Sequence, residues 1–148
     1  MAEQAAPGKP GTQEITVRAD MDQLKTVTDF VNRQLTEYGC SNRAKIQLDV
    51  VIDEVFCNIA RYAYGPEGGT VAVRVMLQEQ PGIIAVTFLD RGRPFNPLEK
   101  EMPDTTRLKA KERPIGGLGL FMVKRFMDSI AYDYQDGQNV LTMQKKIR

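Results

Sequence analysis

Glu54 and Asn58 are the two residues whose types and spacing point most directly to chemistry. They lie four residues apart in an apolar stretch, so on a helix they share one face, one above the other. The apolar stripe of that helix is separate and complete, and it consists of Leu48, Ile52, Val55, Ile59 and Ala63. Packing therefore does not require a carboxylate and a carboxamide beside it. The pair is either an ordinary solvated pair or a carboxylate base next to an oxygen ligand for a hard cation such as Mg²⁺.

A second candidate is Asp90, which ends an apolar segment of strand type and is followed two residues later by Gly92. A carboxylate at a strand end can accept a hydrogen bond from an exocyclic amine such as that of adenine. A glycine beside it leaves room for a flat ring. An aspartate that merely begins a turn would give the same pattern.

The third candidate is the glycine-rich segment from Ile115 to Leu120, which precedes an apolar helix starting near Phe121. A glycine turn that opens a helix presents unpaired backbone N–H groups and the positive end of the helix, and both favour phosphate. A tight loop without a ligand is the alternative. The segment is not a P-loop, because no Gly-Lys-Ser/Thr follows, and no parallel βαβ unit surrounds it as a dinucleotide fingerprint requires.

Composition narrows the function classes. The net charge of +1, from 20 basic and 19 acidic residues, predicts neither direct nucleic-acid binding nor membrane binding. No apolar run approaches the roughly 20 residues that span a bilayer, and the N-terminus has no apolar signal region, so a cytoplasmic protein is expected. The absence of histidine excludes Ser-His-Asp and Cys-His catalysis and His-ligated zinc. Cys40 and Cys57 lack CxxC spacing and are interpreted as core residues.

The elements that must position these residues follow from periodicity, caps and turns. Residues 1–13 are predicted to be a disordered tail, and residues 14–148 to form a single domain with a lid at 96–116. Strands are predicted at 14–19, 70–77, 83–89, 130–135 and 139–147, and helices at 21–38, from 41 or 42 to 64, and after the glycine run. The order β-α-α-β-β-α-β-β favours an α/β two-layer sandwich, with helices on one face of a mixed, mostly antiparallel sheet.

These pieces together resemble a known family. The segments LDVVIDEVFCNIARYAYG, FLDRGRPFNPL and GGLGLFMVKRFMD occur in the order found in the ATP-binding domain of the GHKL superfamily, which includes gyrase, histidine kinase and MutL types and has the Bergerat fold. Within that superfamily they are most similar to the anti-sigma-factor serine/threonine kinase branch. The resemblance covers nearly all of the chain from Glu14 onward.

The resemblance implies a role for each candidate. It implies that Asn58 ligates Mg²⁺ between the phosphates of ATP, and that Glu54 is the general base. It implies that Asp90 binds the adenine amine and that Gly92 lies under the ring. Further nucleotide-binding positions implied by the resemblance are Gly117, Leu118, Gly119 and Leu120 at the phosphates, Thr142 near the adenine aspartate, and Arg61 near a phosphate. The chain departs from the branch at Tyr62, where many members have histidine, and at Arg113, the arginine nearest to the glycine run.

The function implied by the resemblance is a kinase that binds ATP and Mg²⁺ and transfers the γ-phosphate to a serine or threonine of a STAS-type antagonist. Such a protein also holds a sigma factor or a related regulator inactive, and the branch implies a homodimer formed through the first strand and helix. The alternative is a non-catalytic module in which ATP or ADP only controls binding of a protein partner. A structural domain without nucleotide binding is a third hypothesis.

Overall fold

The computed structural model describes residues 11–78, 82–97 and 117–147, and it describes side chains from Phe121 onward in the last range. The elements follow the chain in an order that agrees with the sequence prediction. They are β1 (Thr12–Arg18), η1 (Met21–Gln23), α1 (Leu24–Glu37), α2 (Asn42–Tyr62), β2 (Thr70–Gln78), β3 (Ile83–Asp90), α3 (Gly117–Phe126), β4 (Ser129–Gln135) and β5 (Gln138–Lys146). Among the described residues, no helix is both long and apolar enough to cross a membrane.

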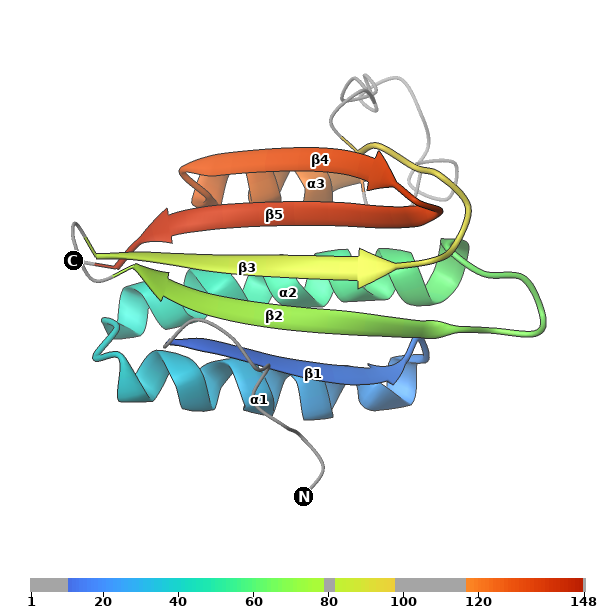
Figure 1. Cartoon of the computed structure of the whole chain (residues 1–148). Coiled ribbons are helices and arrows are strands. Elements are labelled where there is room, and N and C mark those ends of the chain that lie inside the picture. Colours follow the sequence, from blue (N-terminus) through green and yellow to red (C-terminus); the bar gives the residue numbers. More distant parts are fainter. Residues whose placement is uncertain (1–10, 79–81, 98–116, 148) are drawn as a thin grey trace.

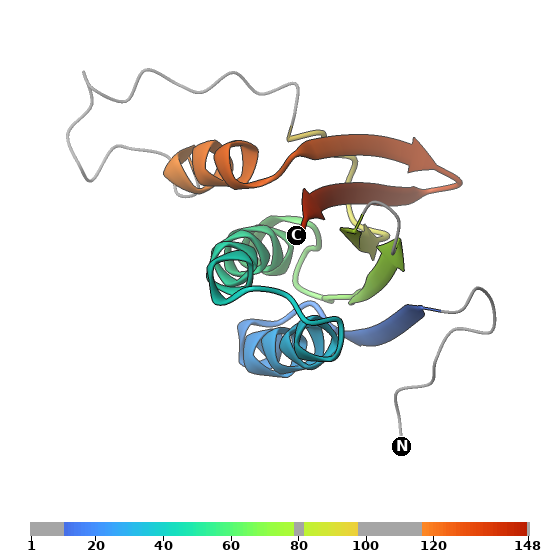
Figure 2. The same ribbon diagram turned by 90° about the vertical axis from the view of Figure 1, so that its left-hand side faces the viewer.

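The strands form one five-stranded sheet in the order β1-β2-β3-β5-β4, with β3 at its centre. All four strand pairs within the described residues are antiparallel. The helices lie together on one face of the sheet, so that Figure 1 looks onto the strands with the helices behind them, and Figure 2 shows the two layers from the side. The predicted two-layer α/β sandwich is therefore confirmed, with a sheet that is antiparallel throughout the described strands.

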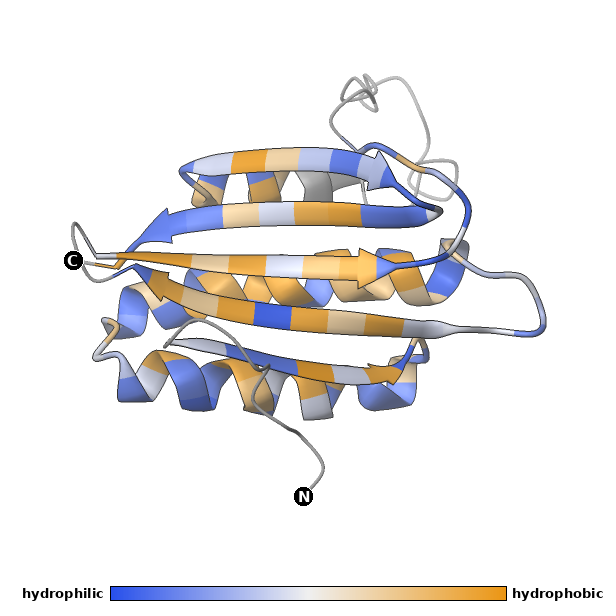
Figure 3. Cartoon of the chain, viewed as in Figure 1, coloured by the Kyte–Doolittle hydropathy of each residue, from blue (hydrophilic) through white to orange (hydrophobic). Residues whose placement is uncertain are grey.

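The core lies between the two layers and is built from alternate strand residues and one stripe of each helix. Figure 3 shows that β3 is apolar along nearly its whole length until it reaches Asp90. The register of the three central strands brings their inward residues side by side. These inward core residues are Val71, Val73, Val75, Ile84, Val86, Phe88, Leu141 and Met143. Because these side chains must be buried, the register of the central strands is fixed, and with it the position of Asp90 at the end of β3.

Capping residues explain where the helices begin. The Asp20 side chain accepts a hydrogen bond from the Asp22 amide at 3.1 Å and starts the short 3-10 turn that leads into α1. The Ser41 hydroxyl accepts one from the Ala44 amide at 3.1 Å and starts α2. Both caps lie at the predicted starts of the first two helices. The first strand begins at Thr12, two residues before the predicted boundary.

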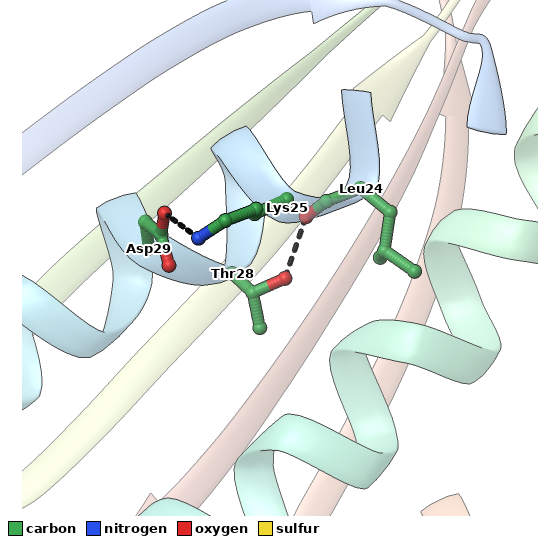
Figure 4. Close-up of polar contacts among 4 residues, drawn as sticks. All are labelled: Leu24, Lys25, Thr28 and Asp29. Atoms are coloured by element: carbon green, nitrogen blue, oxygen red, sulfur yellow. Dashed lines mark hydrogen bonds and ion pairs between the residues drawn. The ribbon is translucent and has the colours of Figure 1, made fainter. Parts of the chain in front are cut away.

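Helix α1 carries an ion pair on its exposed face. Figure 4 shows Lys25 Nζ paired with Asp29 Oδ2 at 2.9 Å, and the Thr28 hydroxyl donating to the Leu24 carbonyl. Because both charged side chains are largely exposed to solvent, this ion pair adds little to stability. The buried face of α1 holds the helix against the sheet through Val27, Phe30, Val31 and Leu35.

Candidate functional site

Asp90 is the last residue of β3 and is buried, with 6% of its surface exposed. Its Oδ1 accepts hydrogen bonds from the Gly92 amide at 2.9 Å and from Asn139 Nδ2 at 3.0 Å. No hydrogen bond to Oδ2 occurs within the described residues. Asp90 therefore begins a turn and also keeps one carboxylate oxygen without a donor among the described residues, so the two sequence interpretations of this residue are compatible.

Asn139 is a site residue that the sequence analysis missed. It stands opposite Asp90 in the β3–β5 register and is equally buried. Besides Asp90, its Nδ2 donates to the Arg93 carbonyl at 3.0 Å, and its Oδ1 accepts from the Phe95 amide at 3.2 Å. The strand alternation could have identified Asn139, because it is a polar residue on the same strand face as Leu141 and Met143, which point into the core.

Thr142 does not belong to this site. Side chains alternate along β5, so Thr142 points to the sheet face opposite that of Asn139. There its hydroxyl lies 3.2 Å from the hydroxyl of Thr87 on β3. The prediction that Thr142 lies near the adenine aspartate is corrected. Asn139 occupies that place, because Thr142 is three positions further along the strand and an odd offset turns a side chain to the other sheet face.

The segment that follows Asp90 is fastened to the end of α2. The Arg91 amide donates to the Tyr64 hydroxyl at 2.7 Å, and that hydroxyl donates to the Thr70 carbonyl at 2.6 Å. The Arg93 amide donates to the Ala63 carbonyl at 2.9 Å. These contacts hold the backbone beyond β3 against the C-terminal end of α2, which carries Glu54 and Asn58 on an earlier turn.

Gly92 has a packing role in this arrangement. A Cβ at this position would lie 2.2 Å from the Ala63 carbonyl oxygen and 2.6 Å from Ala63 Cβ. Only glycine lets the segment approach the helix end so closely. Space for a flat ring was the reason expected for Gly92; the close approach of one backbone to another is a separate reason for glycine at this position.

Glu54 and Asn58 form a pair on α2. Asn58 Nδ2 donates to Glu54 Oε2 at 3.1 Å, and both side chains are half-buried. Asn58 Oδ1 has no hydrogen bond within the described residues. An amide oxygen beside a carboxylate suits Mg²⁺, which binds to one or two protein oxygens and takes its other ligands from water and phosphate. The described residues contain no cluster of three or more His, Cys, Asp or Glu that would hold a metal alone.

The pair lies on the flank of α2 that faces away from α1. Asp49 lies on the opposite flank, which faces α1, because its carboxyl interacts with the side chain of Asn32 on α1 through a hydrogen bond. At about 100° per residue, Glu54 and Asn58 are rotated by about 140° and 180° from Asp49 around the helix axis. Since α2 lies between α1 and α3 (Figure 2), this flank is directed toward α3.

Helix α3 begins at Gly117, so the structure corrects the prediction of a glycine loop that ends near Phe121. Gly117 to Leu120 form the first turn of the helix. Glycine has a low intrinsic helix propensity, which is why a loop was predicted here, but the first turn of a helix can contain it. The first four amide groups of a helix have no partner within the helix. Figure 1 places this end of α3 at the same end of the molecule as the ends of β3 and α2.

Some predicted features lie outside the described part of the chain. These are residues 98–116, which hold most of the predicted lid together with Arg113, Ile115 and Gly116, and also the side chains of Leu118 and Leu120. Arg61, the remaining nucleotide-binding prediction, lies in the last turn of α2 and is exposed.

Cys57 lies near Glu54 and Asn58 on α2, but its thiol is unreactive. Burial is the main cause that raises the pKa of its thiol to about 11, and a hydrogen bond to Asp53 adds to the effect. The thiol is therefore protonated at neutral pH and is a poor nucleophile. Cys40 is buried as well, so the interpretation of both cysteines as core residues is confirmed.

Comparison with known proteins adds sequence relatives. A family model described as the histidine kinase-like ATPase domain matches residues 17–145. The serine/threonine-protein kinase BtrW of Bordetella bronchiseptica is 29% identical over 103 residues, which are 70% of this chain and 71% of that protein. The serine-protein kinase RsbW of Listeria monocytogenes is 28% identical over 107 residues, which are 70% of this chain and 67% of that protein.

Solved structures with the same fold are more distant in sequence. A Mycobacterium tuberculosis structure containing RsbU and RsbW domains superposes with a TM-score of 0.66 at 17% identity. The match covers 92% of this chain and 32% of that one. The histidine kinase domain of a blue-light-activated kinase from Erythrobacter litoralis gives a TM-score of 0.53 at 14% identity, over 96% of this chain and 71% of the other.

Proposed function

The chain belongs to the histidine kinase-like ATPase family, and from this premise we propose that it binds ATP with Mg²⁺ and acts as a serine/threonine kinase on a protein partner. The observation that carries the proposal is the carboxyl of Asp90, buried at the end of the central strand. Two donors hold one of its oxygens, and no described residue hydrogen-bonds to the other. Such a carboxylate is suited to the amino group of adenine, which donates hydrogen bonds.

Other residues of the proposed site would bind the phosphates and their Mg²⁺. Asn58 Oδ1 would ligate Mg²⁺, which supplies neutralisation of the phosphate charge. The unpaired amides in the first turn of α3, from Gly117 to Leu120, would donate to phosphate oxygens. Arg61 adds a positive charge one residue before the end of α2.

Glu54 would act as the general base. It accepts the proton of the attacking serine or threonine hydroxyl while the hydroxyl oxygen bonds to the γ-phosphorus and ADP leaves. The hydrogen bond from Asn58 Nδ2 to Glu54 Oε2 leaves Oε1 to accept that proton. In this proposal one helix face carries both the base and the metal ligand.

The partner part of the proposal rests on the relatives. Both curated relatives described above are named serine or serine/threonine kinases. We propose that the substrate is a STAS-type antagonist and that the chain also holds a sigma factor or a related regulator, with dimerisation through β1 and α1. A protein that only captures its partner under control of ATP or ADP is the second candidate, because Asp90 and Asn58 are needed for nucleotide binding in both cases and Glu54 only for transfer.

The experiment that tests the kinase incubates the full chain with labelled ATP, Mg²⁺ and a STAS-domain partner, and measures phosphoserine and phosphothreonine. Glu54→Gln should lower the transfer rate by about a hundredfold or more while nucleotide binding persists. Asp53→Asn is the matched control, because Asp53 is the exposed neighbour on the same helix, and it should transfer normally. ATP binding without any transfer by the unaltered chain would favour the capture module and reject the kinase.

A further inference from the structure

Asn139 offers an inference that deepens the proposed nucleotide site and rests on it. The orientation of its amide follows from its partners. An oxygen must face the Phe95 N–H and the Tyr132 hydroxyl, which both donate to it, and the NH₂ group must face the Asp90 carboxylate and the Arg93 carbonyl. Both ends of the amide are therefore in use, and each end serves a different neighbour.

We infer that Asn139 is the positioning residue that makes Asp90 selective for a base with an exocyclic amine. Its NH₂ group and the Gly92 amide both donate to Oδ1, at 3.0 and 2.9 Å. Two donors from different elements prevent the carboxylate from rotating about its last bond. They also leave Oδ2 as the oxygen that meets the ligand. Asn139 itself does not touch the base in this arrangement.

The selectivity follows from hydrogen-bond chemistry. An oriented carboxylate oxygen accepts from the amine of adenine, but it faces a carbonyl oxygen in hypoxanthine, the base of ITP. A site built around a buried acceptor discriminates strongly against a ligand that brings no donor. A carboxylate that is free to turn loses part of this discrimination, because its oxygen no longer points in one fixed direction at the amine or the carbonyl of the base.

The two ends of the Asn139 amide can be tested separately. Asn139→Asp keeps the shape and the oxygen that faces Phe95 and Tyr132, but it replaces the NH₂ group with an acceptor directed at Asp90 and Arg93. Tyr132→Phe does the reverse: it removes a partner of the oxygen end and leaves the contact with Asp90 in place. Thr142→Val is a second control on the same strand, because its hydroxyl lies on the opposite sheet face.

The experiment measures Kd for ATP–Mg²⁺ and ITP–Mg²⁺ by calorimetry on the full chain and its variants, with circular dichroism to verify folding. Asn139→Asp should lower the preference for ATP over ITP by about tenfold or more, the worth of one hydrogen bond to a charged group. Tyr132→Phe and Thr142→Val should retain the preference of the unaltered chain. Asn139→Ala, which removes the donor without adding a charge, should give a smaller loss in the same direction, and it decides the matter if Asn139→Asp does not fold.

An unchanged ratio in the folded Asn139 variants, with both nucleotides weakened equally, would overturn this inference and leave Asn139 as a structural tie. The proposed function would survive that result. If the unaltered chain binds neither nucleotide, the proposed function fails first, and the inference fails with it.

Discussion

Replacing Gly92 with alanine is a sharp test of how the site is held together. The added Cβ would lie 2.2 Å from the Ala63 carbonyl oxygen, whereas ordinary contact requires about 3.4 Å. The segment must therefore move by roughly 1 Å away from the end of α2. That movement takes the Arg93 amide, now 2.9 Å from the same oxygen, out of hydrogen-bond range. Because the Gly92 amide also donates to Asp90, the carboxylate is disturbed as well.

The expected cost combines two effects. Overpacking against a backbone atom costs about 1–3 kcal/mol, and the lost hydrogen bond costs about 1 kcal/mol. A loss of about 2–4 kcal/mol lowers the melting temperature by roughly 5–15 °C in a domain of this size. Gly65→Ala is the matched control. Its Cβ would meet no atom within 4 Å, and its φ is not in the left-handed region, so its stability should stay within about 0.5 kcal/mol of the unaltered chain.

Two assays read the outcome. Thermal unfolding followed by circular dichroism gives the stability of both glycine variants, and calorimetry gives their affinity for ATP–Mg²⁺. Gly92→Ala should lose stability and nucleotide affinity together, and Gly65→Ala should lose neither. A Gly92→Ala protein as stable as the Gly65→Ala protein would refute the close approach of this segment to the end of α2.

Other predictions concern the surroundings of the site. Tyr64→Phe leaves the Arg91 amide and the Thr70 carbonyl without their shared partner, so its unfolding free energy should fall by about 1–2 kcal/mol. Tyr62→Phe, on an exposed side chain, should not change it. Burial raises the pKa of Asp49, and its Oδ1 has no hydrogen-bond partner within the described residues. A raised pKa in the folded state means that the ionised carboxyl opposes folding, and that this penalty disappears as pH falls through the raised value. Asp49→Asn should therefore melt at a higher temperature than the unaltered chain at pH 7, with a gap that narrows toward acidic pH; a gap of constant size would contradict this origin.

Much of the fold was predictable because local signals agreed with the tertiary structure. Asp20 and Ser41 cap their helices, and Gly39 adopts a positive φ after α1. Asp136 and Gly137 both have positive φ in the β4–β5 turn, as an Asp-Gly hairpin requires. The resemblance to the GHKL superfamily and its serine kinase branch is confirmed by the family model and by the relatives.

The errors in the site have a common cause, which is that local pattern does not determine position within an element. The last strand was predicted correctly, but a displacement of one residue turns every side chain to the other face. Thr142 lies three residues from Asn139 on β5, so its side chain points away from the sheet face that carries Asp90. The start of α3 was missed because Gly117 and Gly119 have low helix propensity, and packing of α3 against α2 overrides it. The need for glycine at position 92 could not be derived either, since Ala63 lies 29 residues earlier in the chain.

The central claim is that the end of β3 and the face of α2 form an ATP site. Thermal unfolding of the full chain with and without ATP–Mg²⁺ tests it most directly, because a ligand that binds only the folded state raises the melting temperature. We predict a rise for the unaltered chain that increases with ATP concentration, and none for Asp90→Asn, in which an amide replaces one acceptor oxygen of the carboxylate. An equal rise in both proteins, or none in the unaltered chain, would contradict it.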